Sequence, residues 1–194
     1  MSMVADGTLT RGGESDFHLI VEGLHLDRLM HVAQLDDLAI GGELDLNVTV
    51  HGAAEAPSIE SAFGVDDPRY GAIRLTRVEG SMDFDDLLAT VQIDGWENDR
   101  VVIDAAGTLP LDLAFTGVEE RILDAPMAMI IVADSLDAAI ALSYVTSLQN
   151  VVGRISGEVE VGGTLLAPEP DGLVIVEDGE WSVEAIGVRP TAVN

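Results

Sequence analysis

The chain of 194 residues carries 35 acidic side chains against nine cationic ones, all arginine, so its formal net charge is −26. A chain this acidic lacks the clustered cations that phosphate contacts need, which excludes a nucleic-acid-binding protein. The absence of cysteine excludes disulfides, iron–sulfur clusters and cysteine nucleophiles. Hydrophobic residues make up 47% of the chain, too many for a disordered protein. No apolar run approaches the roughly 18 residues that would predict a membrane-spanning segment.

The first regular pattern along the chain is a short helical one. Residues 27–38 place Leu29, Val32 and Leu35 at steps of three, which predicts a helix. Residues 42–52 (GELDLNVTVHG) follow it and alternate strictly between apolar and polar side chains. This alternation predicts a strand with one apolar face and one wet face, as in antiparallel sheets.

Alternation of the same kind recurs along most of the chain, at residues 73–76, 89–94, 101–105, 109–115, 159–161 and 181–185. Turn signals built from glycine and aspartate separate these segments about every 8–12 residues. The sequence therefore predicts an all-β protein. The alternation by itself favours a sandwich of two packed sheets over one curved sheet with an open groove.

A second helical pattern interrupts the strands at residues 134–152. The pair Asp134–Ser135 resembles a helix N-cap, and apolar residues follow at steps of three and four. We expect a short helix with Leu136, Ile140, Tyr144, Leu148 and Val151 on one face.

A weak internal repeat relates two segments that are 111 residues apart. Residues 46–57 (LNVTVHGAAEAP) and 157–168 (GEVEVGGTLLAP) share an alternating strand, a glycine, four residues and then Ala-Pro. We expect one segment of a larger, elongated repeat protein spanning residues 1–194, with repeat units at about 17–133 and 134–194.

No residue pattern indicates catalysis, a metal site or a cofactor site. Serines lie in no nucleophile elbow, and the glycines match no phosphate-binding loop. The cluster Asp83–Asp86 offers oxygens to calcium but has no loop of calcium-binding form, so we interpret it as a solvated edge. The histidines form no metal-binding pair and are expected at the surface rather than as ligands: His18, His25, His31 and His51. We expect a protein that is not an enzyme.

Three stretches carry a resemblance to a known family: Gly107 to Phe115 (GTLPLDLAF), Ala125 to Leu136 (APMAMIIVADSL) and Val152 to Asn194. The last has the order G-R-x-x-G, V-G-G-T-L-x-A-P, and then E-D-G before G-V-R. Together they resemble the C-terminal region of TamB, the translocation and assembly module subunit, among the AsmA-like, bridge-forming lipid-transfer proteins. The likeness extends over about residues 17–194. Each motif alone is loose, whereas their order and spacing are more specific.

The resemblance implies an elongated, curved antiparallel sheet that forms a U-shaped groove with an aliphatic interior, rather than a sandwich. It implies a segment of a periplasmic protein of outer-membrane biogenesis, anchored in the inner membrane and meeting an outer-membrane barrel partner. The family's N-terminal anchor has no counterpart in the sequence, so we expect this chain not to bridge two membranes alone. The expected groove residues are Leu44, Leu46, Val48, Val50, Ile73, Leu75, Val91, Ile93, Val101, Ile103, Leu109, Leu111, Leu113, Val159 and Val161.

Three functions remain open at this point. The groove could carry phospholipid between the inner and outer membranes, because burying each CH₂ group of an acyl chain contributes about 0.8 kcal/mol. The groove or an open sheet edge could instead receive β-strands of outer-membrane or autotransporter proteins during translocation and assembly. A closed structural β-domain is the third alternative.

Overall fold

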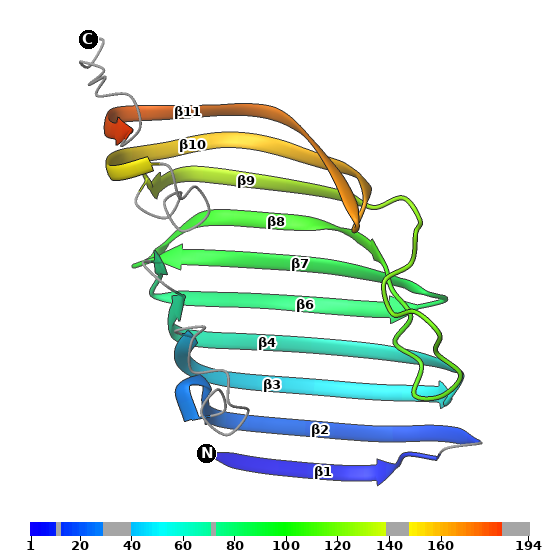
Figure 1. The fold of residues 1–194 in the computed structure, drawn as a ribbon. Helices are drawn as coiled ribbons and strands as arrows, with labels where there is room; N and C mark the ends of the chain where they lie inside the picture. The colour runs from blue at the N-terminus through cyan, green and yellow to red at the C-terminus, as the bar shows by residue number, and fades with distance from the viewer. Residues whose placement is uncertain (11–12, 29–39, 71–72, 139–147, 184–194) are drawn as a thin grey trace.

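The computed structural model describes residues 1–10, 13–28, 40–70, 73–138 and 148–183. These residues form eleven strands (Figure 1), and we found no second sheet among them. The strands are β1 (Ser2–Thr8), β2 (Glu14–His25), β3 (Ile40–Ala53), β4 (Ala56–Tyr70), β5 (Ile73–Arg74), β6 (Arg77–Asp85), β7 (Leu88–Glu97), β8 (Arg100–Pro110), β9 (Ala128–Asp137), β10 (Leu148–Thr164) and β11 (Ala167–Val183).

All strands belong to one antiparallel sheet whose spatial order follows the chain: β1-β2-β3-β4-β6-β7-β8-β9-β10-β11. The short strand β5 pairs only with β4. The sheet is open, with β1 at one edge and β11 at the other (Figure 1). The prediction of an all-β, curved antiparallel sheet is therefore confirmed. The two-sheet sandwich favoured by alternation alone is not what the described part of the chain forms.

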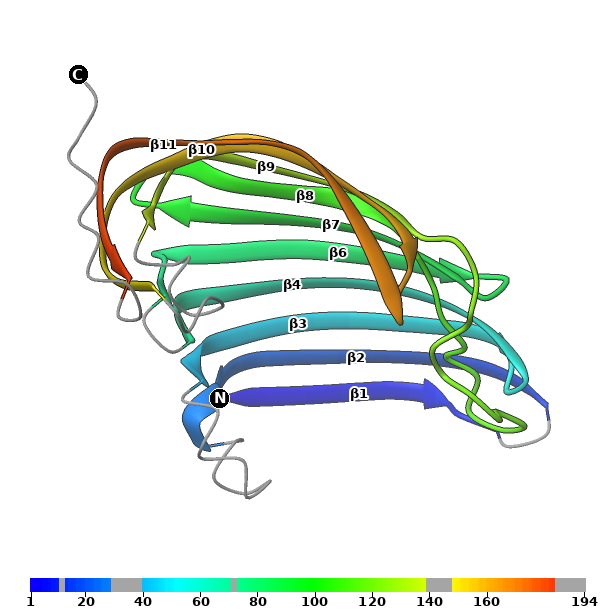
Figure 2. The ribbon, with the colours of Figure 1, turned by 45° about the horizontal axis from the view of Figure 1, so that its top comes forward.

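The sheet is strongly curved, and its strands bend along their length (Figure 2). Breaks in the pairing register accompany this curvature, for example between Val21 and Leu24 and between Gly41 and Glu43. A bulge of this kind bends a strand and increases its local twist. Long strands can therefore form the sides of a trough while each remains in a single sheet.

The prediction of a helix over residues 134–152 is wrong at both ends of this segment. Residues 134–137 continue β9, and residues 148–152 begin β10; residues 139–147 lie outside the described part. Leu136 pairs with Ile155 and is only 9% exposed. Burial against a neighbouring strand outweighs the local helical spacing here. Of the helix expected at 27–38, only residues 27–28 are described, and they belong to a helical turn over residues 26–28.

The strand expected at residues 109–115 ends early, at Pro110. Proline has no N–H group for the ladder, so it is suited to a strand end or an edge. Beyond it, the Asp112 side chain accepts a hydrogen bond of 2.9 Å from the Ala114 N–H, which turns the chain. The segment 111–127, which we call the strap, then runs from β8 to β9 across the ends of several strands (Figure 2).

The weak sequence repeat corresponds to two hairpins of matching geometry. The pairing of β3 with β4 from Glu43↔Asp66 to Ala53↔Ala56 reappears in β10 and β11, shifted by 111 residues, from Arg154↔Glu177 to Thr164↔Ala167. In each hairpin a positive-φ glycine marks the register shift, with φ of 131° at Gly42 and 133° at Gly153. The bounds of the larger repeat units stay a prediction.

An apolar trough as the candidate functional site

The pairing register gathers apolar side chains into four rows on one face of the sheet. Paired residues of neighbouring strands lie on the same face, so each row crosses the strands at nearly right angles. We call this face the trough. The first row is Phe17, Val50, Ile59, Phe84, Ala89 and Leu109; the second is Ala5, Leu19, Val48, Ser61, Met82, Val91, Gly107, Met129, Val161 and Pro170; the third is Met3, Val21, Leu46, Phe63, Gly80, Ile93, Ala105, Ile131, Val159 and Gly172; the fourth is Leu24, Leu44, Val65, Val78, Gly95, Ile103, Ala133, Gly157 and Val174.

The rows include most of the groove residues expected from the sequence: Leu44, Leu46, Val48, Val50, Val91, Ile93, Ile103, Leu109, Val159 and Val161. Leu75 lies outside the strands, near Gly95, where its Cδ1 is 3.2 Å from the position a Cβ would take. Val101 lies beyond a register shift in β7 and β8, where simple alternation no longer assigns a face. Ile73 is placed in β5, but its side chain is outside the described part.

Leu111 and Leu113 were expected in a groove strand, but they lie on the strap. Both are partly buried against a cluster in the first row made of Val50, Ile59, Phe84 and Ala89. They therefore lie over the trough rather than in its floor. The strap therefore covers the first row, at one margin of the trough, and does not cover the second, third and fourth rows.

Burial follows the alternation along the strands and distinguishes the two faces. In β3 and β7, trough residues are buried or half-buried, whereas most residues between them are exposed. Greater burial of one face is expected on the inner side of a curved sheet, where side chains lie closer together. The trough is most deeply buried near the strap, with Val50 4% and Phe84 3% exposed, and Val21 in the third row is also buried. Most other trough side chains keep part of their surface accessible.

Several trough residues were not anticipated from the sequence, because their strands alternate poorly. Ser61 interrupts the apolar series of β4, and the apolar Ile20 obscures the alternation of β2. Phe63 is the clearest omission. Its ring lies over Gly80 of the neighbouring strand, where a Cβ would come within 2.6 Å of two ring carbons. The small residue in β6 therefore makes room for the large one in β4.

Backbone hydrogen bonds attach the strap to three hairpins. The Leu111 N–H donates to the Leu87 carbonyl at 3.0 Å, next to the β6–β7 hairpin. Phe115 donates to the Ala54 carbonyl at 2.8 Å, at the tip of the β3–β4 hairpin, and Met127 donates to Gly163 at 2.9 Å. The strap therefore connects hairpin tips that are far apart in the sheet.

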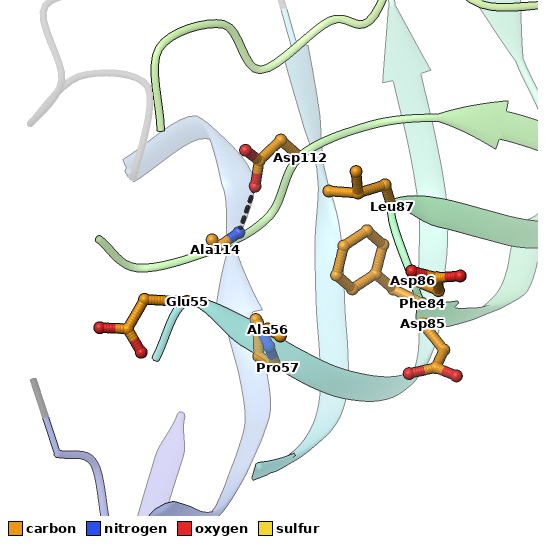
Figure 3. A pocket seen from close by; sticks show the side chains of 9 residues that line it. All are labelled: Glu55, Ala56, Pro57, Phe84, Asp85, Asp86, Leu87, Asp112 and Ala114. Carbon is orange, nitrogen blue, oxygen red and sulfur yellow. Dashed lines mark hydrogen bonds between the residues drawn. The ribbon is translucent and has the colours of Figure 1, made fainter. Parts of the chain in front are cut away.

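A pocket of about 310 Å³ lies where the strap meets two hairpin tips (Figure 3). The Phe84 ring and Leu87 form its apolar side, and the strap contributes Asp112 and Ala114. The pocket is bordered by three acidic residues, Glu55, Asp85 and Asp86. No group of three or more possible metal ligands converges among the described residues, here or elsewhere. Asp85 and Asp86 are exposed, in agreement with a solvated edge.

The opposite face of the sheet is mainly polar and strongly acidic, although β9 and β11 place the exposed apolar residues Ile130, Leu173 and Ile175 on it. Glu79, Asp94 and Asp104 are successive cross-strand partners at its centre. Partial burial raises the pKa of Asp94, and a hydrogen bond and negative charge from Asp104 and the charge of Glu79 raise it further. Carboxylates placed directly opposite one another repel, so this ladder destabilises the sheet locally while it hydrates the outer face.

Three of the four histidines lie among these polar positions. The His18 Nε2 is 2.8 Å from the Asn47 Oδ1, and the His51 Nδ1 is 3.3 Å from an Asp16 carboxylate oxygen. His25 lies 3.8 Å from Glu43. These are cross-strand contacts of exposed or half-buried side chains, as expected for surface residues. His31 lies outside the described part.

A helix long and apolar enough to span a membrane is absent from the described residues. No family model matches the chain, and no curated protein or solved structure was found that matches it.

Proposed function

We propose that the trough holds the acyl chains of phospholipid, and that the chain is a non-enzymatic segment of a TamB-like, periplasm-spanning protein of outer-membrane biogenesis. The observation that carries this proposal is the continuity of the second and third rows. Each runs from β1 to β11 across ten strands, and Ser61 is their only polar member among the described residues.

The dimensions of the trough suit an acyl chain. Neighbouring strands are about 4.8 Å apart, so nine intervals give rows of about 43 Å. One leaflet of a bilayer has a hydrocarbon depth of about 15 Å. The rows could therefore take more than one acyl chain end to end. Because the rows cross the strands, a guest would move along the sheet from one edge toward the other.

The side chains of the trough also suit a mobile apolar guest. The floor is mainly valine, leucine, isoleucine and methionine, interrupted by glycines, and few groups there could fix a guest by hydrogen bonds. Every transferred CH₂ group contributes about 0.8 kcal/mol without requiring a particular orientation. The strand ladders satisfy the backbone polar groups beneath this surface, so an acyl chain would not meet unpaired N–H or C=O groups there.

Paired substitutions on the two faces test the proposal. Val48→Glu with Ile93→Glu adds two charges to the trough, whereas Thr49→Glu with Gln92→Glu adds two charges at the adjacent positions on the outer face. We expect the trough pair to weaken the binding of an environment-sensitive fluorescent phospholipid by about tenfold or more, because each charge must be desolvated by the guest. The outer-face pair should bind like the unsubstituted chain.

Fluorescence titration of the three proteins, with circular dichroism to confirm folding, measures this difference. Equal lipid affinity of the trough pair and the outer-face pair would count against the trough as the binding surface. If the trough pair does not fold, the single substitution Ile93→Gln, matched with Gln92→Asn, provides the same comparison with a smaller perturbation.

A further inference from the structure

The first row of the trough differs from the second row in what covers it. On β3, Val50 of the first row is 4% exposed, whereas Val48 of the second row is half-buried. Every member of the second row is half-buried or exposed. The same strands carry both rows, so the sheet itself does not account for this difference. Leu111 and Leu113 of the strap pack against the first row and supply the cover.

The strap reaches the first row as a continuation of β8. Leu109 is the first-row residue of β8, and Leu111 and Leu113 follow it at steps of two. All three pack against the same buried cluster. Leu109 does so from the floor of the trough, whereas the two strap leucines lie over the floor. They therefore occupy the space that an apolar guest on this row would need.

The attachment of the strap does not involve the floor of the trough. Backbone hydrogen bonds hold this part of the strap to hairpin tips, from Leu111 to the Leu87 carbonyl and from Phe115 to the Ala54 carbonyl. The Arg121 side chain donates its hydrogen bonds within the strap itself. The strap can therefore leave the first row without breaking the strand ladders beneath it.

The cover that the strap provides is incomplete at one place. The pocket of about 310 Å³ lies where the strap meets two hairpin tips, and the first-row residue Phe84 forms part of its apolar side (Figure 3). A guest can therefore contact the first row here before the strap moves. Once a guest extends along the row, its CH₂ groups replace the leucine side chains. The row then stays out of contact with water both with the strap and with the guest.

The length of the first row suits one acyl chain. The row crosses six neighbouring strands, from Phe17 on β2 to Leu109 on β8. Five intervals of about 4.8 Å give a length of about 24 Å. One leaflet of a bilayer has a hydrocarbon depth of about 15 Å.

We propose that the first row is a further binding site for an acyl chain, that Leu111 and Leu113 occupy it in the absence of a guest, and that the guest displaces the strap. This inference rests on the proposed function, because its guest is the acyl chain proposed for the trough. Strap and guest compete for one surface, so the closed strap lowers the apparent affinity for lipid. By reciprocity, the bound guest loosens the strap.

Substitutions on the two sides of the strap test this competition. Leu111→Ser with Leu113→Ser weakens the contact with the first row. Phe115→Ser with Ile122→Ser is the matched control, at strap residues that are 41% and 43% exposed. We expect the leucine pair to bind the environment-sensitive fluorescent phospholipid about threefold or more tightly than the unsubstituted chain, because fewer molecules have a closed strap. The control pair should bind like the unsubstituted chain.

Hydrogen exchange in the unsubstituted chain gives an independent measurement. Phospholipid should accelerate exchange at the Leu111 and Phe115 amides by about threefold or more, because these amides lose their sheet acceptors when the strap opens. A lipid bound beside an intact strap would leave their exchange unchanged or slow it. If the leucine pair does not fold, Arg121→Ala matched with Arg100→Ala loosens the strap without changing the first row.

The outcomes separate this inference from the proposed function. Phospholipid binding with equal affinity in the leucine pair and the unsubstituted chain would overturn the inference and leave the proposed function standing. Binding without faster exchange of the strap amides would do the same. If none of these proteins bound phospholipid, the proposed function would fail, and this inference would fail with it.

Discussion

At the scale of single residues, the trough depends on which positions are small as much as on which are apolar. Gly80 lies between Phe63 and Ile93 in the third row, and a Cβ there would also come within 2.8 Å of the Gln92 carbonyl oxygen. The backbone oxygen cannot move as freely as the ring. A side chain at this position therefore disturbs both the aromatic packing and the strand pairing.

We predict that Gly80→Val lowers the free energy of unfolding by about 1–3 kcal/mol, because it overpacks this contact. Gly64→Val is the matched control on the adjacent strand, since a Cβ at Gly64 meets no atom within 4 Å. Valine also suits a strand better than glycine, so the control should keep or slightly increase stability. Urea denaturation of both variants measures the difference. Equal losses would show that the contact with Phe63 is unimportant.

The second prediction for single residues concerns the acidic ladder of Glu79, Asp94 and Asp104. The sign of its effect on the pH dependence of stability follows from the raised pKa of Asp94. A carboxyl whose pKa is higher in the folded than in the unfolded state favours folding when protonated. Its contribution is therefore greatest below the unfolded value of about 4. Stability is lost as the pH rises through the folded pKa.

Asp94→Asn should therefore stabilise the chain at pH 7, because it removes the repulsion between the carboxylates. The gain should be small, roughly 0.5 kcal/mol, since solvent screens this partly buried group. The gain should disappear below about pH 4, where the carboxyl is protonated in both states, and it should shrink at high salt. Thermal unfolding at several pH values checks this. A variant that is less stable than the unsubstituted chain at pH 7 would contradict the stated origin of the shift.

At the scale of elements, the strap is the part of the fold that alternation could not predict. Arg121 stabilises it by donating from Nη1 to the carbonyl oxygens of Asp112 and Ala114, each at 3.1 Å. These bonds close the turn that brings Leu113 onto the first row. Nothing in the local sequence indicates that an arginine nine residues away completes this turn.

We predict that Arg121→Ala lowers the free energy of unfolding by about 1 kcal/mol, since two carbonyl oxygens lose a charged donor. Hydrogen exchange should accelerate at the amides of Leu111 and Phe115, which attach the strap to two hairpins. Arg100→Ala, at an exposed position at the start of β8, is the matched control. Unchanged exchange in the strap would show that Arg121 does not hold it.

The element scale also shows how far the sequence could predict this fold. The strict alternation at Leu44–Val50 correctly predicts a strand and its apolar face, because burial on one side is the dominant constraint there. Several expected turns, by contrast, lie inside strands. Asp67 and Asp178 adopt positive φ within β4 and β11, where they kink a continuous strand. Composition alone does not distinguish a kink from a turn, since both need a residue that tolerates this conformation.

The candidate site was predictable to a similar extent. Residues of regular strands, such as Val91 and Val159, could be assigned to one apolar face, but the sequence could not show which strands are neighbours. Leu111 and Leu113 continued the alternating pattern of β8 and were therefore expected in the floor. Pro110 ended that strand and allowed the chain to fold over the trough instead.

At the scale of the whole molecule, the fold divides its surface into two faces with opposite solvent preferences. A sheet of one layer would normally bury its apolar face against a second layer. The described residues supply only the strap, which covers the first row. The acidic outer face and the high net charge favour solubility and oppose association between copies, so the remaining rows can stay accessible. This combination motivates the central claim that the trough receives an apolar guest.

Native mass spectrometry of the purified chain, combined with lipid analysis of an organic extract, tests that claim most directly. We predict bound species whose masses match extractable phospholipid, present in the unsubstituted chain and in Thr49→Glu with Gln92→Glu. They should be lost from Val48→Glu with Ile93→Glu. Equal phospholipid in all three proteins, or none in any of them after incubation with phospholipid vesicles, would contradict the account.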